Sequence, residues 1–525
     1  KNGEYELILP KKDNYTIIFS HILYDNYKLK LKYKSIESNL SNENVFYQDI
    51  SLIEKIESLD NISLLGRSNE RAFGITTINL STLNKTPGYS ESIETLIKSL
   101  PGVSSNNELS NQYSVRGGSF DENLIYVNGI EIYKSFLVKN AEQEGLSFIN
   151  PNLVSSIEFY PGGFLAKHGD KLSSVLDIKY KKPKQNKIKL SLSPMGTNFS
   201  IEGNTKDYRF SYILGHRYKS NQFLINSLDL NGNFRPIMSD IQAYLTYQIN
   251  PELELSLLAY RSNNTYQMVP ENRETVFGSV TESLKLTIYF EGEEVDKFIT
   301  SMGALSLNFE PNEETDIKLT SSFFRTKEEL FYDIEGEYWL GQLENNIGSD
   351  DFGDVVVNRG IGSYMNHARN ELKANVFNID LNGETKFLNQ TINTGIKYQH
   401  EQISDNIREW EMIDSAGYSV PNGGIEVGIY NFIKGNASLN SNRLMTHLQI
   451  SNNYSLSNKA EINYSAGIRA NYWNFNNETF ISPRFIIGYK PKWEKDFVFT
   501  LSCGSYNQSP FFREIRNKAG EINAD

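Results

Sequence analysis

Apolar residues recur at every second position in most segments after about residue 183. One example runs through Leu305, Leu307 and Phe309, with polar residues between them. A period of two is typical of β-strands that bury one face. Short turns between these segments alternate with long polar stretches, which we expect to be loops at about residues 262–301, 325–370 and 401–440. The pattern predicts a large, mostly antiparallel sheet.

The stretch from about residue 72 to residue 182 has a different, mixed pattern. Apolar residues at i, i+3, i+4 and i+7 from Ile93 to Leu100 predict one face of a helix that ends at Pro101-Gly102. Two short apolar segments flank Asn128-Gly129, a pair that favours a two-residue hairpin turn because both positions adopt positive φ. Further short strands are predicted at residues 154–160 and 175–180. We expect a small α+β domain here.

The beginning of the chain predicts the end of a small β-domain followed by a linker. The strand-like segments are Gly3–Pro10, Tyr15–Ser20 and Tyr27–Tyr33. The polar stretch after them is rich in Asn, Ser and Glu and holds one short apolar island, Ile62–Leu65. An extended island in a flexible tether can pair with the edge of a partner's sheet. A strand of the chain's own domain and an adhesive patch of linker are the alternatives.

Composition and charge narrow the class of protein. The 525 residues include 31 Tyr, 30 Phe and 36 Gly beside 4 Trp. This suits membrane strands with aromatic girdles, although soluble all-β proteins have a similar composition. No apolar run approaches the roughly 18 residues that a membrane helix needs. The net charge of -12 argues against a nucleic-acid partner, which favours a basic face.

The sequence lacks the motifs of common catalytic and metal sites. It has no G-x-S-x-G, Walker or H-E-x-x-H motif, and its 6 histidines form no H-x-x-x-H pair. Cys503 is the single cysteine, which excludes an intramolecular disulfide and a thiolate metal cluster. We therefore predict no enzyme activity, no metal and no cofactor.

Three segments resemble the plug of TonB-dependent receptors. They are L-I-K-S-L-P-G-V at Leu96–Val103, Y-S-V-R-G-G-S-F-D-E-N-L-I-Y-V-N-G-I-E-I-Y at Tyr113–Tyr133, and the segment Ile149–Ile178, which ends in L-S-S-V-L-D-I. They follow one another in the order and spacing of the family. The opening G-E-Y-E-L-I-L-P and the later Y-T-I-I-F-S-H resemble the last strands of the carboxypeptidase-regulatory-like domain. This arrangement resembles Bacteroidetes receptors, nearer to the non-SusC branch.

The resemblance implies a mostly β fold, namely a transmembrane antiparallel β-barrel with an α+β plug in its lumen and a partial N-terminal β-sandwich. The family's barrel has about 22 strands. The residues after Pro183 suffice for roughly 12–14 strands with their loops, so we expect an incomplete barrel. The implied domains are the end of the regulatory-like sandwich (1–34), a linker with a candidate TonB box (35–71), the plug (72–182) and a partial barrel (183–525).

The resemblance also assigns candidate site residues. The apolar island aligns with the TonB box, which pairs with the periplasmic energy transducer TonB, through Asp60, Asn61, Ile62, Ser63, Leu64 and Leu65. The plug motif comprises Arg116, Gly117, Gly118, Asn128 and Gly129. Arg116 would be held as a latch by carboxylates of the plug or barrel wall, or would be a purely structural buried arginine. Tyr338 and Trp339, in a predicted loop, could stack on a ligand or pack on the barrel.

The implied function is active transport of a ligand across the bacterial outer membrane, gated by pairing of the plug with TonB. The plug and N-terminal domain would be accessible from the periplasm. The expected partners are TonB, outer-membrane lipid and either a surface lipoprotein or a larger membrane complex, with no nucleic acid. The alternative is a receptor-like barrel that serves as a structural or assembly subunit of a larger outer-membrane complex. The residues do not identify a substrate.

Overall fold

A computed structural model of the chain describes residues 7, 14–21, 24–32, 50, 74–78, 80, 92–105, 110–133, 136, 146–227, 232–279, 281–388, 390–414, 428–456, 460–493, 495, 497–517 and 520–523. The chain divides into two compact units, Lys1–Ser68 and Asn69–Asp525.

The described part of the first unit contains a two-stranded antiparallel sheet, in which β1 (Asn14–His21) pairs with β2 (Tyr24–Lys32). Ile17 is opposite Leu29 in this pair, and the basic residues on either side of Leu29 are exposed. Two of the three predicted strands are therefore present. The segment Gly3–Pro10, apart from Leu7, and the candidate TonB box Asp60–Leu65 lie outside the described residues. The assignment to a regulatory-like domain stays a prediction.

The second unit begins with a small mixed sheet, which we call the plug (described residues from Gly74 to Tyr180). Its strand order is β3-β8-β9-β6-β7, in which β6 and β9 are parallel and the other neighbours antiparallel. These strands are β3 (Thr76–Thr77), β6 (Asn123–Val127), β7 (Ile130–Glu131), β8 (Val154–Tyr160) and β9 (Ser174–Tyr180). Shorter elements complete the plug: the pair β4 (Val103–Ser104) and β5 (Ser114–Val115), and the 3-10 helices η2 (Phe120–Glu122) and η3 (Pro151–Leu153).

The predicted helix of the plug is present as α2 (Ile93–Lys98). It begins after Ser92, whose side chain accepts a hydrogen bond from the backbone N–H of Thr95 and so caps the first turn. The predicted apolar face is buried, since Ile93 and Ile97 are 0% exposed and Leu96 is 5% exposed. The helical spacing of these residues therefore identified the core-facing side of α2 correctly.

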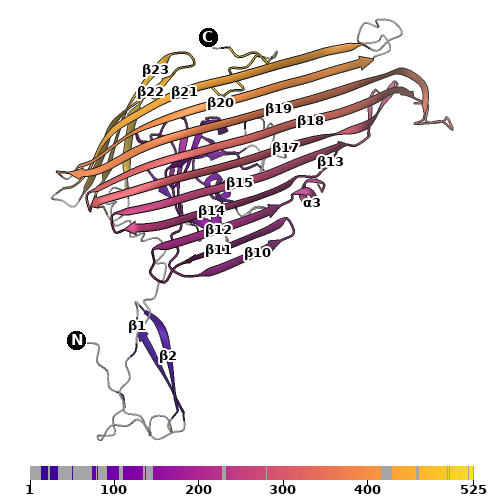
Figure 1. The fold of residues 1–525 in the computed structure, drawn as a ribbon. Helices are drawn as coiled ribbons and strands as arrows, with labels where there is room; N and C mark the ends of the chain where they lie inside the picture. Colours follow the sequence, from indigo (N-terminus) through magenta and orange to yellow (C-terminus); the bar gives the residue numbers. More distant parts are fainter. Residues whose placement is uncertain are drawn as a thin grey trace. The chain divides into compact units, whose positions relative to one another are not determined.

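The remainder of the second unit is a 15-stranded antiparallel sheet, which we call the wall (Figure 1). Its main path runs β10-β11-β12-β14-β15-β17-β18-β19-β20-β21-β22-β23-β24, and β13 and β16 pair with β15 and β17 off this path. In the described residues, the end strands β10 and β24 do not pair with each other. The helix α3 (Gln222–Ile225) lies between β12 and β13 in the sequence.

The strands of the wall are β10 (Lys187–Ser193), β11 (Gly196–Asn204), β12 (Phe210–Lys219), β13 (Gly232–Phe234), β14 (Ile237–Asn250), β15 (Leu253–Pro270), β16 (Arg273–Gly278), β17 (Ser283–Asn312), β18 (Thr315–Leu343), β19 (Val355–Phe387), β20 (Gln390–Asp414), β21 (Ile429–Ser455), β22 (Glu461–Trp473), β23 (Glu478–Lys490) and β24 (Phe499–Gly504).

The three stretches predicted as long loops are largely strands, and this prediction was wrong. Strand β18 runs to Leu343 and β19 begins at Val355, so only residues 344–354 of the predicted loop 325–370 connect strands. Strands β15 and β17 likewise enter the stretch 262–301, and β20 and β21 enter 401–440. Polar residues suggested loops, but a strand that meets water on both faces needs no apolar side while its backbone stays paired. From β14 to β21, short connections such as residues 251–252 and 313–314 lie at one end of the strands, the short-turn rim. Longer connections such as residues 344–354 lie at the other end, the long-loop rim.

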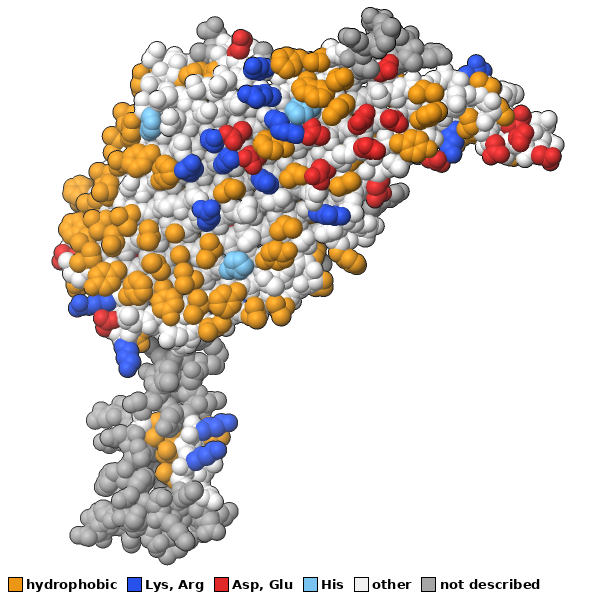
Figure 2. Space-filling view, turned by 45° about the vertical axis from the view of Figure 1, so that its right-hand side comes forward, with side chains coloured by type: hydrophobic (Ala, Val, Ile, Leu, Met, Phe, Trp, Pro, Cys, Tyr) orange, Lys and Arg blue, Asp and Glu red, His pale blue; other side chains and the backbone are white. Residues whose placement is uncertain are grey.

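Alternate residues of the wall face opposite sides, as predicted. On β17, Leu305 and Phe309 are 49% and 38% exposed, whereas Ala304 and Ser306 are each 2% exposed. Figure 2 shows apolar side chains gathered over one part of the exposed face of the wall. In this part of β17 the large apolar residues therefore face outward, and the small and polar residues between them face inward.

The plug packs against the inner face of the wall, and Figure 1 shows the sheet curving around it. A single cluster of buried side chains joins Val127 and Ile157 of the plug to Tyr260, Met302 and Phe324 of the wall. No helix among the described residues is long and apolar enough to cross a membrane.

Candidate functional site

The predicted hairpin at Asn128-Gly129 forms the tip between β6 and β7. Both residues have positive φ, at 52° and 76°, and Val127 pairs with Ile130 across the turn. The turn is therefore the predicted two-residue hairpin. The Asn128 side-chain oxygen accepts a hydrogen bond from the backbone N–H of Tyr180 at 2.9 Å. Lys318 of the wall donates to the Asn128 carbonyl, so the tip is bound both to the plug and to the wall.

The Arg116-Gly117-Gly118 segment has a tight backbone, but Arg116 does not fulfil either predicted role. Its side chain is exposed, and among the described residues it has no carboxylate partner. Arg116 and Gly117 have φ of 51° and 85°, and the Arg116 N–H donates to the Gly102 carbonyl at 2.8 Å. A Cβ on Gly118 would lie 1.8 Å from the Ser173 hydroxyl oxygen, so close approach requires glycine there. The tight geometry of this segment lies in its backbone, and other residues make the polar contacts between plug and wall.

A buried arginine of the wall binds one edge of the plug. Arg217 of β12 donates to the backbone carbonyls of Ser147 and Ile149 at 2.6 Å and 2.8 Å. Its guanidinium also pairs with Asp240 of β14, with 3.0 Å between Nε and Oδ1. Arg217 and Asp240 are only 7% and 2% exposed. A charged group so buried is stable only when paired and fully hydrogen-bonded, which this arrangement provides.

A second polar contact lies beside the β6–β7 hairpin. Lys397 of β20 pairs with Glu131 at 2.5 Å. The neighbouring Tyr133 hydroxyl donates to the Gln399 side-chain oxygen at 2.9 Å. Nearby, the buried Glu328 of β18 accepts the backbone N–H of Phe136 at 2.9 Å and 3.0 Å. Inner-face residues of the wall therefore bind both the backbone of the plug, at Phe136, and one of its carboxylates, that of Glu131.

A third polar contact joins the plug to the later strands. Arg469 of β22 makes a bidentate contact with Asp170, at 3.1 Å and 2.8 Å. Arg484 of β23 donates to the carbonyls of Leu165 and His168 at 2.8 Å and 2.6 Å. Burial opposes ionisation of Asp170, but the attraction of Arg469 outweighs it and holds the pKa of that carboxyl below its usual range. Asp170 is therefore a carboxylate at neutral pH.

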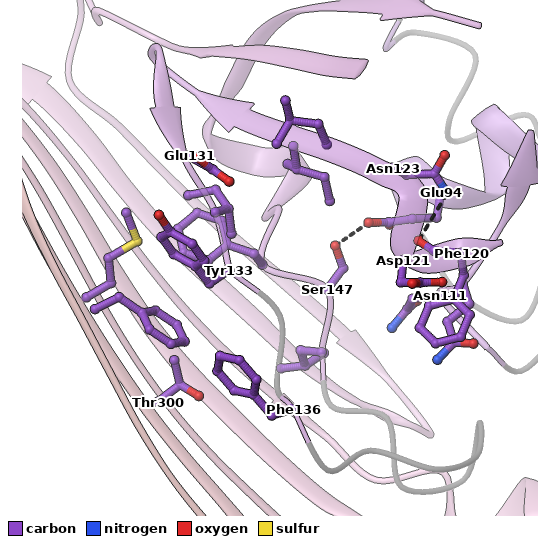
Figure 3. A pocket seen from close by; sticks show the side chains of 18 of the residues that line it. Glu94, Asn111, Phe120, Asp121, Asn123, Glu131, Tyr133, Phe136, Ser147 and Thr300 are labelled. Carbon is purple, nitrogen blue, oxygen red and sulfur yellow. Dashed lines mark hydrogen bonds between the residues drawn. The ribbon is translucent and has the colours of Figure 1, made fainter. Parts of the chain in front are cut away.

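A cavity of about 530 Å³ lies between the plug and the wall. In Figure 3, Glu94, Phe120 and Asp121 lie on one side of it, and Tyr133, Phe136 and Thr300 lie on the other. Its lining combines aromatic rings with charged groups, of which the acidic ones are Glu94, Asp121, Glu131 and Glu514 and the basic ones are Lys171 and Arg513. Aromatic faces and a few convergent polar groups are typical of small-molecule sites.

Glu94 of α2 is the most buried acidic side chain of the cavity lining. It is 3% exposed, and the Ser147 hydroxyl donates to one of its carboxylate oxygens. Within the described part of the chain, the other oxygen has no hydrogen-bond partner. A buried acceptor without a partner is costly, so it is available to a donor that enters the cavity. In the same described residues, no group of three or more His, Cys, Asp or Glu side chains could hold a metal ion.

Tyr338 and Trp339 are strand residues of β18, which corrects their predicted place in a loop. Because neighbouring residues of a strand face opposite sides, the two rings do not form one stacking platform. Trp339 is 39% exposed, and the Tyr338 hydroxyl lies 2.2 Å from where a Cβ on Gly362 would be, on the adjacent β19. Neither residue lines the cavity between plug and wall.

The wall residues that bind the plug were not predicted from the sequence. Arg217, Lys397 and Arg469 occupy inward positions of strands whose alternate residues face outward. A charged residue at a strand position that faces inward was therefore the one feature of the sequence that could have indicated these contacts. Their partners could not be identified, because each partner lies in a distant part of the sequence.

Comparison with known proteins identifies the small domain. Residues 67–173 match the family described as TonB-dependent Receptor Plug Domain. Comparison with curated proteins gives no match.

Several solved structures resemble the chain. One is the outer membrane transporter YddB from Escherichia coli, with 12% identity and a TM-score of 0.47 over 79% of this chain and 58% of that chain. Others are BauA, the ferric preacinetobactin receptor from Acinetobacter baumannii (10% identity, TM-score 0.44, 86% and 66%), and the FrpB iron transporter from Neisseria meningitidis (10% identity, TM-score 0.39, 83% and 80%). At these identities and TM-scores the likenesses carry no argument about function. The chain spans 58% of the length of the YddB chain.

Proposed function

We propose that this chain is a TonB-dependent outer-membrane receptor, which the match of its plug domain supports. It carries a ligand across the outer membrane when TonB moves the plug relative to the wall. The observation that supports this most is the polar attachment of the plug. Inner-face side chains such as Arg217, Lys397 and Arg469 bind plug carbonyls and carboxylates. The plug is thus held in place by contacts that can be exchanged.

Polar contacts suit a domain that must move and return. When a hydrogen-bonded ion pair separates into water, water replaces the lost partners, so the net cost is far below the strength of the contact in a dry interior. Apolar contacts between Val127 or Ile157 and the wall would instead expose surface on separation. A pulling partner would then remodel the plug by breaking the polar contacts first.

The cavity between plug and wall is the proposed place of the ligand. One side of the cavity belongs to the plug and carries Glu94, Phe120 and Asp121, and the other belongs to the wall and carries Thr300 and Phe324. Movement of the plug would displace the first side from the second. A ligand bound to both sides would therefore lose its contacts with one of them and be released. Transport of this kind uses no covalent chemistry and no cofactor.

The proposed handle is the segment Asp60–Leu65. Its apolar residues Ile62 and Leu64 alternate with Ser63, which suits addition of one strand to the sheet edge of TonB. Strand addition is mediated by backbone hydrogen bonds, so it tolerates much variation in side chains. The partner would thereby grip the chain mechanically on the periplasmic side.

Proline substitution tests the handle. Ile62→Pro or Leu64→Pro removes a backbone donor and fixes φ, so binding of the purified complete protein to the periplasmic domain of TonB should weaken by at least about tenfold. Asn42→Pro, in the same predicted linker, is the matched control and should bind as the wild type does. Equal binding by all variants would contradict the assignment. Lost TonB binding together with undiminished recovery of a larger membrane complex would favour the assembly role over transport.

A further inference from the structure

The outer face of the wall carries an apolar band near the short-turn rim. Residues that pair across neighbouring strands form rows on this face. On β18 and β19 the row of Phe323 and Phe377 marks the edge of the band, because Arg325 and Asn375 form the next row. Nearer the short-turn rim, exposed residues of the band include Leu257, Leu305, Leu319, Ile379, Leu381, Ile396, Tyr398 and Leu444. An outward apolar band of this kind is the part of a membrane barrel that contacts hydrocarbon.

Basic side chains occupy the next rows toward the long-loop rim. Arg325 follows Phe323 by two residues, which is about 7 Å along the strand. It lies in one row with Arg261, because both are opposite Ser301 of β17. In further rows, Lys327 lies opposite Lys373 and Arg408 lies opposite Lys434. We call the whole set the basic belt; it consists of Arg261, Lys297, Arg325, Lys327, Arg369, Lys373, Arg408 and Lys434.

Most of the belt's positive charge is uncompensated. Carboxylates pair with only part of the belt: Lys327 with Glu329 and Glu371, Lys373 with Glu371, and Arg369 with Asp333. The remaining belt residues are exposed and, among the residues that the structure describes, have no carboxylate partner: Arg261, Lys297, Arg325, Arg408 and Lys434. The belt is therefore a surface of net positive charge in a chain whose net charge is -12.

Beyond the belt, several outward side chains are acidic. Glu293 of β17 lies opposite Asp333 of β18, and Glu291 lies opposite Glu335 in the following row. In Figure 2 the orange band is followed by an area rich in blue side chains, with some red and orange ones among them, and red side chains become more frequent toward the far end of the strands. The basic belt thus lies between the apolar band and these acidic rows.

We propose that the basic belt binds the phosphate groups of a phosphorylated glycolipid in the outer leaflet of the membrane. The apolar band fixes the depth at which acyl chains end, and the belt begins one row beyond it. Arginine and lysine are the side chains that bind phosphate best, by charge-assisted hydrogen bonds. A free phosphate would gain nothing from the neighbouring apolar band, whereas a lipid headgroup is held beside the belt by its own acyl chains.

The width of the belt favours a large headgroup. The rows from Arg325 to Phe331 cover about 20 Å of strand, which at a tilt of about 40° is roughly 15 Å along the membrane normal. The headgroup layer of a simple phospholipid is only about 5–8 Å thick. Phosphates attached at more than one depth, as on a sugar headgroup, can therefore use the whole belt. This inference does not depend on the proposed transport function.

Lipid binding can be measured on the complete protein in dodecyl maltoside micelles. Native mass spectrometry would count bound molecules of diphosphoryl lipid A, with dephosphorylated lipid A and inorganic phosphate as separate probes. We expect the wild type to retain the diphosphoryl lipid. One variant that removes five charges of the belt should bind this lipid at least about tenfold more weakly. It carries the substitutions Arg261→Gln, Lys297→Gln, Arg325→Gln, Arg408→Gln and Lys434→Gln. Retention should also fall as salt is raised.

A control variant matches this loss of charge at the opposite rim, with the substitutions Lys184→Gln, Lys187→Gln, Lys206→Gln, Arg209→Gln and Lys492→Gln. It should retain the lipid as the wild type does. Unchanged retention by the belt variant would overturn the proposal, as would equal retention of the dephosphorylated lipid. Displacement of the lipid by inorganic phosphate at similar concentration would also overturn it, because it would show a site for free phosphate.

Discussion

Asp170 controls one plug–wall contact through its charge. It has a φ of 45° and presents both carboxylate oxygens to Arg469 of β22. Asparagine tolerates positive φ, so replacing Asp170 with asparagine removes the charge without straining the backbone. The charge of this contact can therefore be tested separately from its geometry.

We expect Asp170→Asn to lower the stability of the folded protein in detergent at pH 7 by about 1–3 kcal/mol, because a charge-assisted contact is lost. The pKa of Asp170 is lowered in the folded state, so its stabilising effect is present above the unfolded pKa and is lost as pH falls through the folded value. The difference between variant and wild type in thermal unfolding should therefore shrink below about pH 4.

The exposed rim residue Glu313 provides the control for this pH series. It lies in the short turn between β17 and β18 and is exposed. Glu313→Gln should unfold as the wild type does at every pH. A deficit of Asp170→Asn that stays constant from neutral to acid pH would show that the carboxylate charge does not stabilise the plug–wall contact.

At the scale of single elements, the β6–β7 hairpin depends on Asn128 for two separate properties. The residue adopts a φ of 52°, and its side-chain oxygen accepts the Tyr180 N–H. Glycine keeps the first property and loses the second, whereas alanine loses both. The pair of substitutions therefore separates backbone strain from the lost hydrogen bond.

We predict that Asn128→Ala destabilises the protein more than Asn128→Gly does, by about 1 kcal/mol, because only alanine is strained at positive φ. Both variants should be less stable than the wild type, since the Tyr180 N–H is left without its acceptor. Thermal unfolding in detergent measures both differences. Equal stability of the two variants would mean that the turn relaxes to another conformation.

Local signals predicted the plug well. The spacing from Ile93 to Leu100 and the Asn128-Gly129 pair each specify a structure within a few residues, and both structures are present. The prediction of a loop at residues 325–370 was wrong, because a polar strand outside hydrocarbon lacks the apolar alternation by which strands are recognised. Its length is maintained by pairing with neighbouring strands, which no local pattern records.

The candidate site was predictable only in part, for a related reason. The cavity and the polar contacts of Arg217, Lys397 and Arg469 join residues that are far apart in the sequence. The inward position of each cation could be derived from alternation along its strand. Its partner depends on how the plug is oriented within the wall, which single residues do not determine.

At the scale of the whole molecule, the inner and outer faces of the wall have different roles. The inner face contacts the plug through apolar residues such as Met302 and Phe324, and through polar side chains whose partners water can replace. The outer face carries the apolar band, which would hold the wall at a fixed depth in the membrane. A fixed wall and a detachable plug are what a transporter moved by an external partner requires.

Ala166 provides the most direct measurement of plug movement, because it is sealed between plug and wall. It is 1% exposed, and a Cβ on Gly467 of β22 would lie 2.7 Å from its own Cβ. In a Cys503→Ser background, Ala166→Cys is the only thiol of the chain. A small polar maleimide applied to cells can then label it only when the plug leaves the wall.

We predict that Cys at position 166 is labelled in energised cells that contain TonB, and is protected when the proton gradient is collapsed or Ile62→Pro is added. Glu313→Cys, at the exposed rim, should be labelled under every condition and confirms access of the reagent. Labelling at position 166 that is absent throughout, or equal with and without TonB, would contradict the account of a plug that TonB moves.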